Sequence, residues 1–191
     1  MPWSILGGRT HFTALESQQH GRAEIWDPAT ESFTLLDARH RVARTYHSSA
    51  VLMADGRVFT GGGGLCHSCD VNHLDAEIFS PPYLFNSDGS LARRPSIFLF
   101  QDSVQLGSSF RIRGSQRFSI VSLIRYGSAT HSTDTDQRRI ELCGFRTRRC
   151  RGNDLTLTVP SDPGIAIRGN WMVFGVNFAG VPSVSRNLLL T

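Results

Sequence analysis

Lysine is absent from this sequence: all 20 basic residues are arginine, and with 16 acidic residues the formal net charge is +4. So modest a charge indicates solubility rather than a chain built to bind a polyanion. No apolar run approaches the roughly 18 residues that a membrane-spanning helix requires, which excludes such a span. Residues 1–10 lack the charged start and apolar middle of a signal peptide, so secretion cannot be inferred from this N-terminus.

The first half of the chain repeats itself. The segment 23–28 returns as 76–81, about 50 residues later, and the Gly7-Gly8 doublet returns as the run 61–64. This period, with double glycines and short β-runs, is typical of kelch-type propeller blades. An Ala54-Asp55-Gly56 turn between two β-runs adds a hairpin signal. Two blades cannot close a propeller, so we expect a fragment or blades supplied from elsewhere.

The residue pattern changes in the turn-rich stretch 86–95, where we place a domain boundary. Beyond it the pattern predicts about seven short strands, which is typical of an immunoglobulin-like sandwich. The expected strands are 96–100, 109–112, 119–125, 138–142, 155–159, 171–177 and 184–190. The predicted fold is therefore all-β: the last kelch-type propeller blades over residues 1–93, then an immunoglobulin-like β-sandwich over 94–191.

Six arginines crowd into residues 138–151. A nucleic-acid interface needs a basic face with several aromatic residues that stack on bases, and only Phe145 lies inside this cluster. We therefore expect no nucleic-acid partner and interpret the cluster as a solvated hairpin.

The four cysteines form two close pairs, Cys66 with Cys69 and Cys143 with Cys150. Two local disulfides are the favoured interpretation, because a hairpin can bring the second pair together and the preceding glycines allow a tight turn at the first. Free thiols, a redox Cys-x-x-Cys and a zinc site stay open as alternatives. Disulfides would indicate an oxidising compartment.

Of the seven histidines, His47 has the most informative setting, because Tyr46 precedes it and both open a β-run before the glycine run. Neighbours on a regular strand point to opposite faces. For both side chains to bind one metal, the backbone must leave strand geometry at this junction. His67 and His73, which flank the Cys-x-x-Cys segment, are expected to be structural.

Seven segments in chain order resemble the C-terminal portion of the copper radical oxidases, the family of galactose oxidase and glyoxal oxidase. They are 44–48, 55–59, 61–66, 72–76, 123–131, 135–139 and 180–184. The resemblance extends over nearly the whole chain from about Ala23 onward. It implies a seven-bladed kelch propeller with one copper ion on its axis, and an immunoglobulin-like early-set domain that sends a histidine up the central hole.

Carried over residue by residue, the resemblance makes Tyr46 the axial ligand and His47 and His131 the equatorial histidine ligands of copper. The family oxidises a primary alcohol or an aldehyde and reduces O2 to H2O2. The expected partners are thus a small alcohol, aldehyde or carbohydrate substrate and O2, in a secreted parent protein. Tyr46 would be catalytic, as the general base for the substrate hydroxyl.

The chain departs from the family pattern in its radical cofactor. The family's other equatorial ligand is a tyrosine cross-linked to a cysteine; the remaining tyrosines here, Tyr83 and Tyr126, are not positioned for that role. We therefore expect the Tyr-Cys cross-link to be absent from this polypeptide and the polypeptide to be inactive alone. It would then be a fragment of an oxidase, or an oxidase whose gene model is cut at its 5′ end. The rival hypothesis is a non-catalytic scaffold that binds a carbohydrate or a protein.

Overall fold

The computed structural model describes residues 4–9, 19–27, 30–44, 46–67, 72–130 and 133–191. The chain divides into two compact units. The first unit comprises Met1–Val51, Phe59–Phe79 and Ala129–Thr135, and the second comprises Leu52–Val58, Ser80–Ser128 and Asp136–Thr191. The chain therefore passes between the units several times. No helix in the described part is long or apolar enough to cross a membrane.

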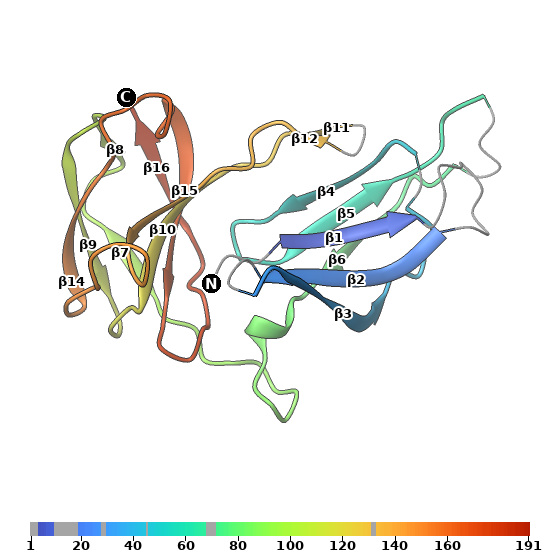
Figure 1. The fold of residues 1–191 in the computed structure, drawn as a ribbon, viewed down its shortest axis with the longest axis horizontal. Coiled ribbons are helices and arrows are strands. Elements are labelled where there is room, and N and C mark those ends of the chain that lie inside the picture. The colour runs from blue at the N-terminus through green and yellow to red at the C-terminus, as the bar shows by residue number, and fades with distance from the viewer. Residues whose placement is uncertain (1–3, 10–18, 28–29, 45, 68–71, 131–132) are drawn as a thin grey trace. The chain divides into compact units, whose positions relative to one another are not determined.

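Two three-stranded sheets make up most of the first unit, with orders β1-β2-β3 and β4-β5-β6 (Figure 1). Their strands are β1 (Ser4–Arg9), β2 (Gln19–Asp27), β3 (Ser32–Arg39), β4 (Ser48–Leu52), β5 (Val58–Gly62) and β6 (Ala76–Phe79). The sequence repeat relates β1 to β5 and β2 to β6. Hence β3 has no described counterpart in the second sheet and β4 none in the first. Each sheet thus has three described strands. The four-stranded blade and the propeller stay predictions.

The second unit is a β-sandwich. One sheet has the order β13-β10-β15-β16-β8 and the other β14-β9-β7. The strands are β7 (Ile97–Leu99), β8 (Ser103–Val104), β9 (Ser109–Gly114), β10 (Ile120–Arg125), β13 (Arg139–Cys143), β14 (Asp154–Thr158), β15 (Gly169–Val176) and β16 (Arg186–Leu190). All seven strands expected beyond residue 95 are present, and the two-residue β8 was missed because it is too short to show alternation.

The core of the sandwich is formed by alternate side chains of both sheets. In β9 the residues alternate between exposed and buried, so that Phe110 and Ile112 point inward at 1% and 0% exposure. They pack with Leu157 of the same sheet and with Trp171 and Leu188 of the other. This period of two follows from the pleat of a strand with one buried face.

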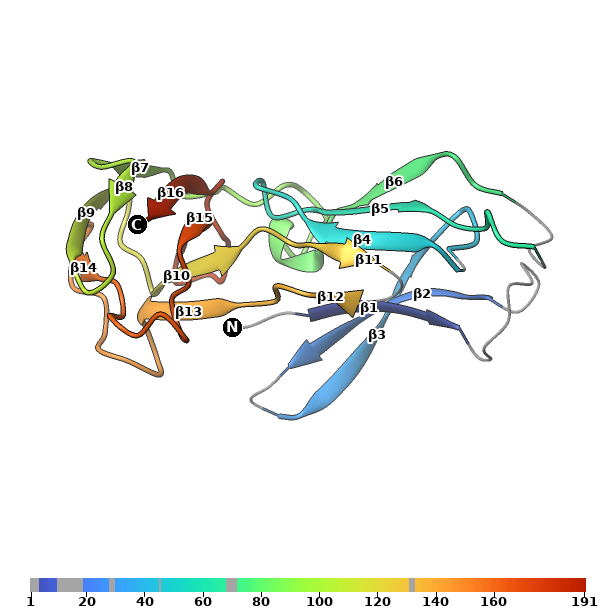
Figure 2. The same ribbon diagram turned by 90° about the horizontal axis from the view of Figure 1, so that it is seen from above.

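A short hairpin, β11 (Ala129–Thr130) and β12 (Thr133–Asp134), connects β10 to β13 (Figure 2). The residues of this hairpin cluster with the first unit, whereas β10 and β13 belong to the second. At its root Arg125 donates to the Asp136 carboxylate at 2.8 Å and to the Asn170 carbonyl at 2.7 Å. The Arg125 guanidinium also lies over the Trp171 ring, 5.2 Å from its centroid. The two legs of the hairpin are thus tied to the sandwich core.

The β4–β5 turn is the Asp-Gly turn that the sequence predicts, and it belongs to the second unit. Gly56 has φ +80°, and Asp55 accepts a hydrogen bond from the Arg57 amide at 3.0 Å. The phenol of Tyr83, in the 3-10 helix η2 (Pro82–Leu84), donates to the Gly56 carbonyl. Ser185 donates its amide to Ala54 at 2.8 Å. Turn, η2 and sandwich are therefore one framework.

Burial raises the pKa of Tyr83 to about 12. Because the ordinary value is about 10, the unfolded chain loses this proton first, so the stabilisation is full below pH 10 and disappears as pH rises towards 12. Between pH 8 and pH 12 we expect a loss of at most about 3 kcal/mol in the free energy of unfolding from this group. Urea unfolding of the wild type and Tyr83→Phe across this range measures it. An equal alkaline loss in both proteins contradicts the assignment.

Phe118 is fully buried between two glycines of the sandwich. A Cβ on Gly114 would lie 2.6 Å from Cε2 of Phe118, and one on Gly175 would collide with the other edge of the ring. We expect Gly175→Ala to destabilise the second unit by about 1–3 kcal/mol, because the ring cannot move aside in a close-packed core. Thermal unfolding measures the loss. Combining it with Phe118→Leu should restore part of it; full additivity would contradict the proposed clash.

Candidate metal centre

Tyr46 and His47 lie at the junction where the sequence requires a departure from strand geometry. His47, the last residue before β4, has φ +62°, in the left-handed region that residues other than glycine seldom adopt. The rings of Tyr46 and His47 consequently lie on the same side, with centroids 3.9 Å apart and an interplanar angle of 35°. Phenol and imidazole are thereby placed together instead of on opposite faces of a strand.

The glycine run holds this dipeptide through its backbone. The Gly64 amide donates to the Tyr46 carbonyl at 2.7 Å, and Nδ1 of His47 lies 3.0 Å from the Gly64 carbonyl oxygen. At Gly62, with φ +78°, a Cβ would approach the His47 carbonyl oxygen to 2.8 Å. Only glycine allows the two segments to pack this closely.

The hydrogen bond between Nδ1 of His47 and the Gly64 carbonyl suits a metal-binding histidine. A carbonyl oxygen can only accept, so the proton of a neutral His47 ring is on Nδ1 and the lone pair is on Nε2. Metal-ligating histidines typically donate their other ring nitrogen to a carbonyl or carboxylate in this way. An imidazole nitrogen beside a phenol oxygen is a donor set that Cu(II) accepts. The residues present therefore fit copper.

His131, the third expected ligand, and Cys69 lie outside the described residues. The hairpin that flanks His131 clusters with the same unit as Tyr46 and His47. Within the described part, no three His, Cys, Asp or Glu side chains lie close enough to hold a metal ion. That Tyr46, His47 and His131 bind one metal ion together stays a prediction.

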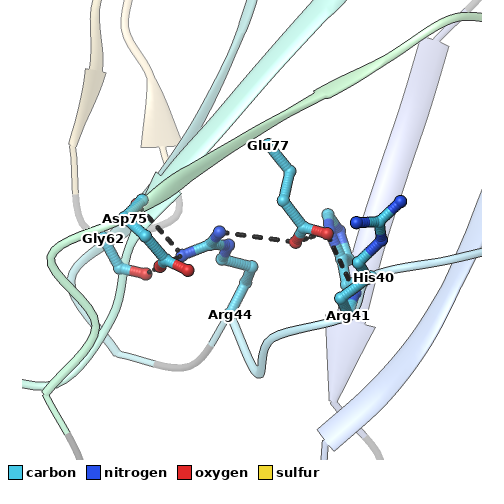
Figure 3. Close-up of polar contacts among 6 residues, drawn as sticks. All are labelled: His40, Arg41, Arg44, Gly62, Asp75 and Glu77. Carbon is cyan, nitrogen blue, oxygen red and sulfur yellow. Dashed lines mark hydrogen bonds and ion pairs between the residues drawn. The ribbon is translucent and has the colours of Figure 1, made fainter.

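Arg44 holds the glycine run through the Gly62 carbonyl (Figure 3). Its side chain is only 6% exposed, and Nη1 donates to the Gly62 carbonyl at 3.0 Å and to the Asp75 carboxylate at 2.9 Å. Nη2 reaches Glu77 at 3.3 Å, which also accepts from the Arg41 amide at 2.9 Å. One guanidinium thus ties together the segment before Tyr46, the glycine run and the start of β6.

The carboxylates around Arg44 are held in their charged form. The hydrogen bond from Arg44 lowers the pKa of Asp75. Burial on its own raises the pKa of Glu77, but the Arg41 amide, His40 and Arg44 outweigh it, so that the pKa lies below its ordinary value. Lowered carboxyl pKa values mean that this stabilisation is present above about pH 4 and is lost as the pH falls further.

We expect Arg44→Met to destabilise the glycine run by about 2–3 kcal/mol at pH 7, since it removes hydrogen bonds that involve two carboxylates. Hydrogen exchange at the amides of Gly62 and Gly64 measures the change locally. In the wild type the same amides should lose protection below pH 4. Arg41→Met is the matched control, because Arg41 is exposed and bonds Glu77 through its backbone. Equal effects of the two substitutions would refute the role of the Arg44 guanidinium.

The structure answers the question that the cysteine spacing leaves open. Cys143 and Cys150 form a disulfide, and Cys66 is disulfide-bonded as well. No described cysteine is a free thiol. The zinc and free-thiol alternatives therefore do not apply to these three residues, and none of them has a sulfur available for a thioether with tyrosine. A redox Cys-x-x-Cys is itself a disulfide when oxidised, so this finding does not test the redox alternative at Cys66.

Residues 94–189 match the family described as "Galactose oxidase-like, Early set domain". The sandwich is therefore an immunoglobulin-like early-set domain, and half of the chain lies within it. The chain belongs to the galactose oxidase-like family, as the resemblance predicts.

Curated relatives support this membership. Galactose oxidase of Gibberella zeae is 47% identical over 169 residues, which cover 88% of this chain and 24% of the relative. Aldehyde oxidase GLOX of Vitis pseudoreticulata is 33% identical over 157 residues, covering 76% of this chain and 29% of the relative. The chain thus spans about a quarter of the length of these relatives.

A solved structure of a fungal alcohol oxidase of the AA5 family, in complex with copper, is similar over 99% of this chain and 40% of its own. Its TM-score is 0.85 and its sequence identity 40%. Copper is thus found in a structural relative whose similarity includes both the sandwich and the sheets of the first unit.

Sequence reasoning did not assign roles to Arg44, Gly64 and Asp75, although each lies in a segment that carries the family resemblance. Arg44 is two residues before Tyr46. Its burial indicates its role in joining segments, because a buried guanidinium requires several acceptors. Those acceptors are 18 to 33 positions away in the sequence, so spacing alone does not find them.

Proposed function

We propose that this chain supplies the copper-binding dipeptide and the histidine-bearing hairpin of a copper radical oxidase, with Tyr46, His47 and His131 as ligands. The observation that carries the proposal is the left-handed turn at His47. It brings an imidazole beside a phenol, and the Gly64 carbonyl sets the tautomer that leaves the lone pair on Nε2. Backbone strain of this kind persists where the surroundings impose it and is concentrated at functional sites.

The reaction that we propose for the complete oxidase is the oxidation of a primary alcohol or an aldehyde, with O2 reduced to H2O2. When bound, copper supplies one-electron redox chemistry and a Lewis-acid centre for the substrate oxygen. In that oxidase Oη of Tyr46, in the tyrosinate form that a bound Cu(II) would favour, would take the proton of the substrate hydroxyl as general base. Gly64 fixes the His47 ring through Nδ1, and Arg44 fixes the glycine run, so neither ring has to reorganise when the substrate binds.

A two-electron oxidation needs a second one-electron acceptor besides the metal, which the family provides as a cross-linked tyrosine. In this chain Cys66, Cys143 and Cys150 are in disulfides, and the Tyr83 phenol donates to the Gly56 carbonyl. We propose that the radical cofactor is not formed by this polypeptide and that it binds copper without turning over alcohols. The disulfides further support an oxidising, extracellular location.

The test is a titration of the 191-residue chain with Cu(II), followed by calorimetry and electron paramagnetic resonance. We expect one tight site with hyperfine coupling to two nitrogens. His47→Ala and His131→Ala should each weaken binding about 100-fold, corresponding to about 2.7 kcal/mol. Tyr46→Phe should change the spectrum while leaving both nitrogen couplings.

His67→Ala is the matched control, since it removes an exposed imidazole that is not a proposed ligand. If both ligand variants bind Cu(II) as tightly as the wild type, the metal site is refuted. The scaffold hypothesis then remains as the account of this chain.

A further inference from the structure

The loop 144–151, here named the arginine loop, is pre-organised at the edge of the sandwich. The disulfide closes it with a Cα–Cα distance of 5.2 Å, and Cys143 is 1% exposed within the core. The Gly144 amide donates to the Arg148 carbonyl at 3.0 Å, and the Arg148 guanidinium donates to the Thr156 carbonyl of β14 at 2.8 Å. Such a loop loses little conformational entropy when it binds a partner.

Every carboxylate in residues 136–158, the segment that contains this loop, is engaged by an arginine outside the loop. Glu141 pairs with Arg139 and accepts only the amide of Arg146 and the hydroxyl of Thr147 from the loop. Asp136 pairs with Arg125 and Arg138, and Asp154 with Arg111 and Arg113. These are the three acidic residues between positions 136 and 158.

The arginine loop therefore carries positive charge that no described carboxylate neutralises. Its four arginines are exposed, and none forms an ion pair in the described part of the chain; they are Arg146, Arg148, Arg149 and Arg151. The whole-chain charge of +4 conceals this local excess, because acidic residues elsewhere offset it. In the same loop the Phe145 ring is 76% exposed to solvent.

We propose that the arginine loop binds an acidic polysaccharide, a chain of uronate sugars. Guanidinium groups recognise carboxylates through paired hydrogen bonds, and a polyuronate offers them at regular intervals. The Phe145 ring offers an apolar surface to the C–H face of a pyranose, whose burial is favourable. A nucleic-acid strand fits less well, because stacking along such a strand needs several aromatic side chains and the loop has one. This binding is independent of copper and of the proposed oxidation.

The test measures binding of the full chain to polygalacturonate by calorimetry at 50 mM NaCl, with a neutral galactan as the uncharged probe. We expect R146Q/R148Q/R149Q to weaken polygalacturonate binding about tenfold or more. The matched control R93Q/R117Q/R186Q removes three exposed arginines elsewhere on the second unit, and we expect a change of about twofold or less. Equal losses in the two triple variants would overturn the proposal, because they would show attraction to overall charge.

Two further variants separate binding from folding and charge from sugar contact. R146Q/R149Q spares the Arg148 bond to β14, so it should fold as the wild type does and still bind several-fold more weakly. Phe145→Ala keeps every charge and should weaken polygalacturonate binding several-fold without affecting its salt dependence. Unchanged binding in either variant contradicts the proposal. Tighter binding to a single-stranded oligonucleotide of equal charge would also overturn it.

Discussion

The close packing of the glycine run against the Tyr46-His47 dipeptide is the constraint on which the candidate site depends. The left-handed backbone at His47 is unfavourable by itself. The amide and the carbonyl of Gly64, which bond the Tyr46 carbonyl and the His47 ring, hold it there together with the missing side chain of Gly62. Once that turn is imposed, the neighbouring phenol and imidazole share one side, and the histidine tautomer follows. The metal-binding proposal rests on this backbone geometry more than on any individual side chain.

Two arginines anchor the segments that carry or flank the proposed ligands. Arg44 links the glycine run to β6 in the first unit, and Arg125 ties the legs of the β11–β12 hairpin to the sandwich core in the second. Both guanidiniums are largely buried and bind carboxylates together with backbone carbonyls. A planar group with five donors suits this use, since it connects several segments at once.

The fold could be predicted well from local pattern, because a strand with one buried face shows itself by alternation. The strands of the sandwich were found in this way, as was the Asp55-Gly56 turn, whereas β8 and the β11–β12 hairpin, with strands of two residues, leave no periodic signal. The disulfide between Cys143 and Cys150 was the favoured of several options, and a loop closed by the bond from the Gly144 amide to the Arg148 carbonyl brings the two residues together. The roles of Arg44 and Asp75 were missed because burial and distant acceptors define them.

The amino-acid sequence by itself determined the all-β class, the identity of the two adjacent donors and, through its ordered motifs, the family. Those properties follow from the residue types and their local spacing. Tertiary structure alone decided that His47 turns back beside Tyr46 and that Arg44 closes on Gly62. It also decided which arginines are neutralised and which face solvent without a carboxylate. These outcomes depend on contacts between segments far apart in the chain, and no local pattern encodes which distant groups will meet.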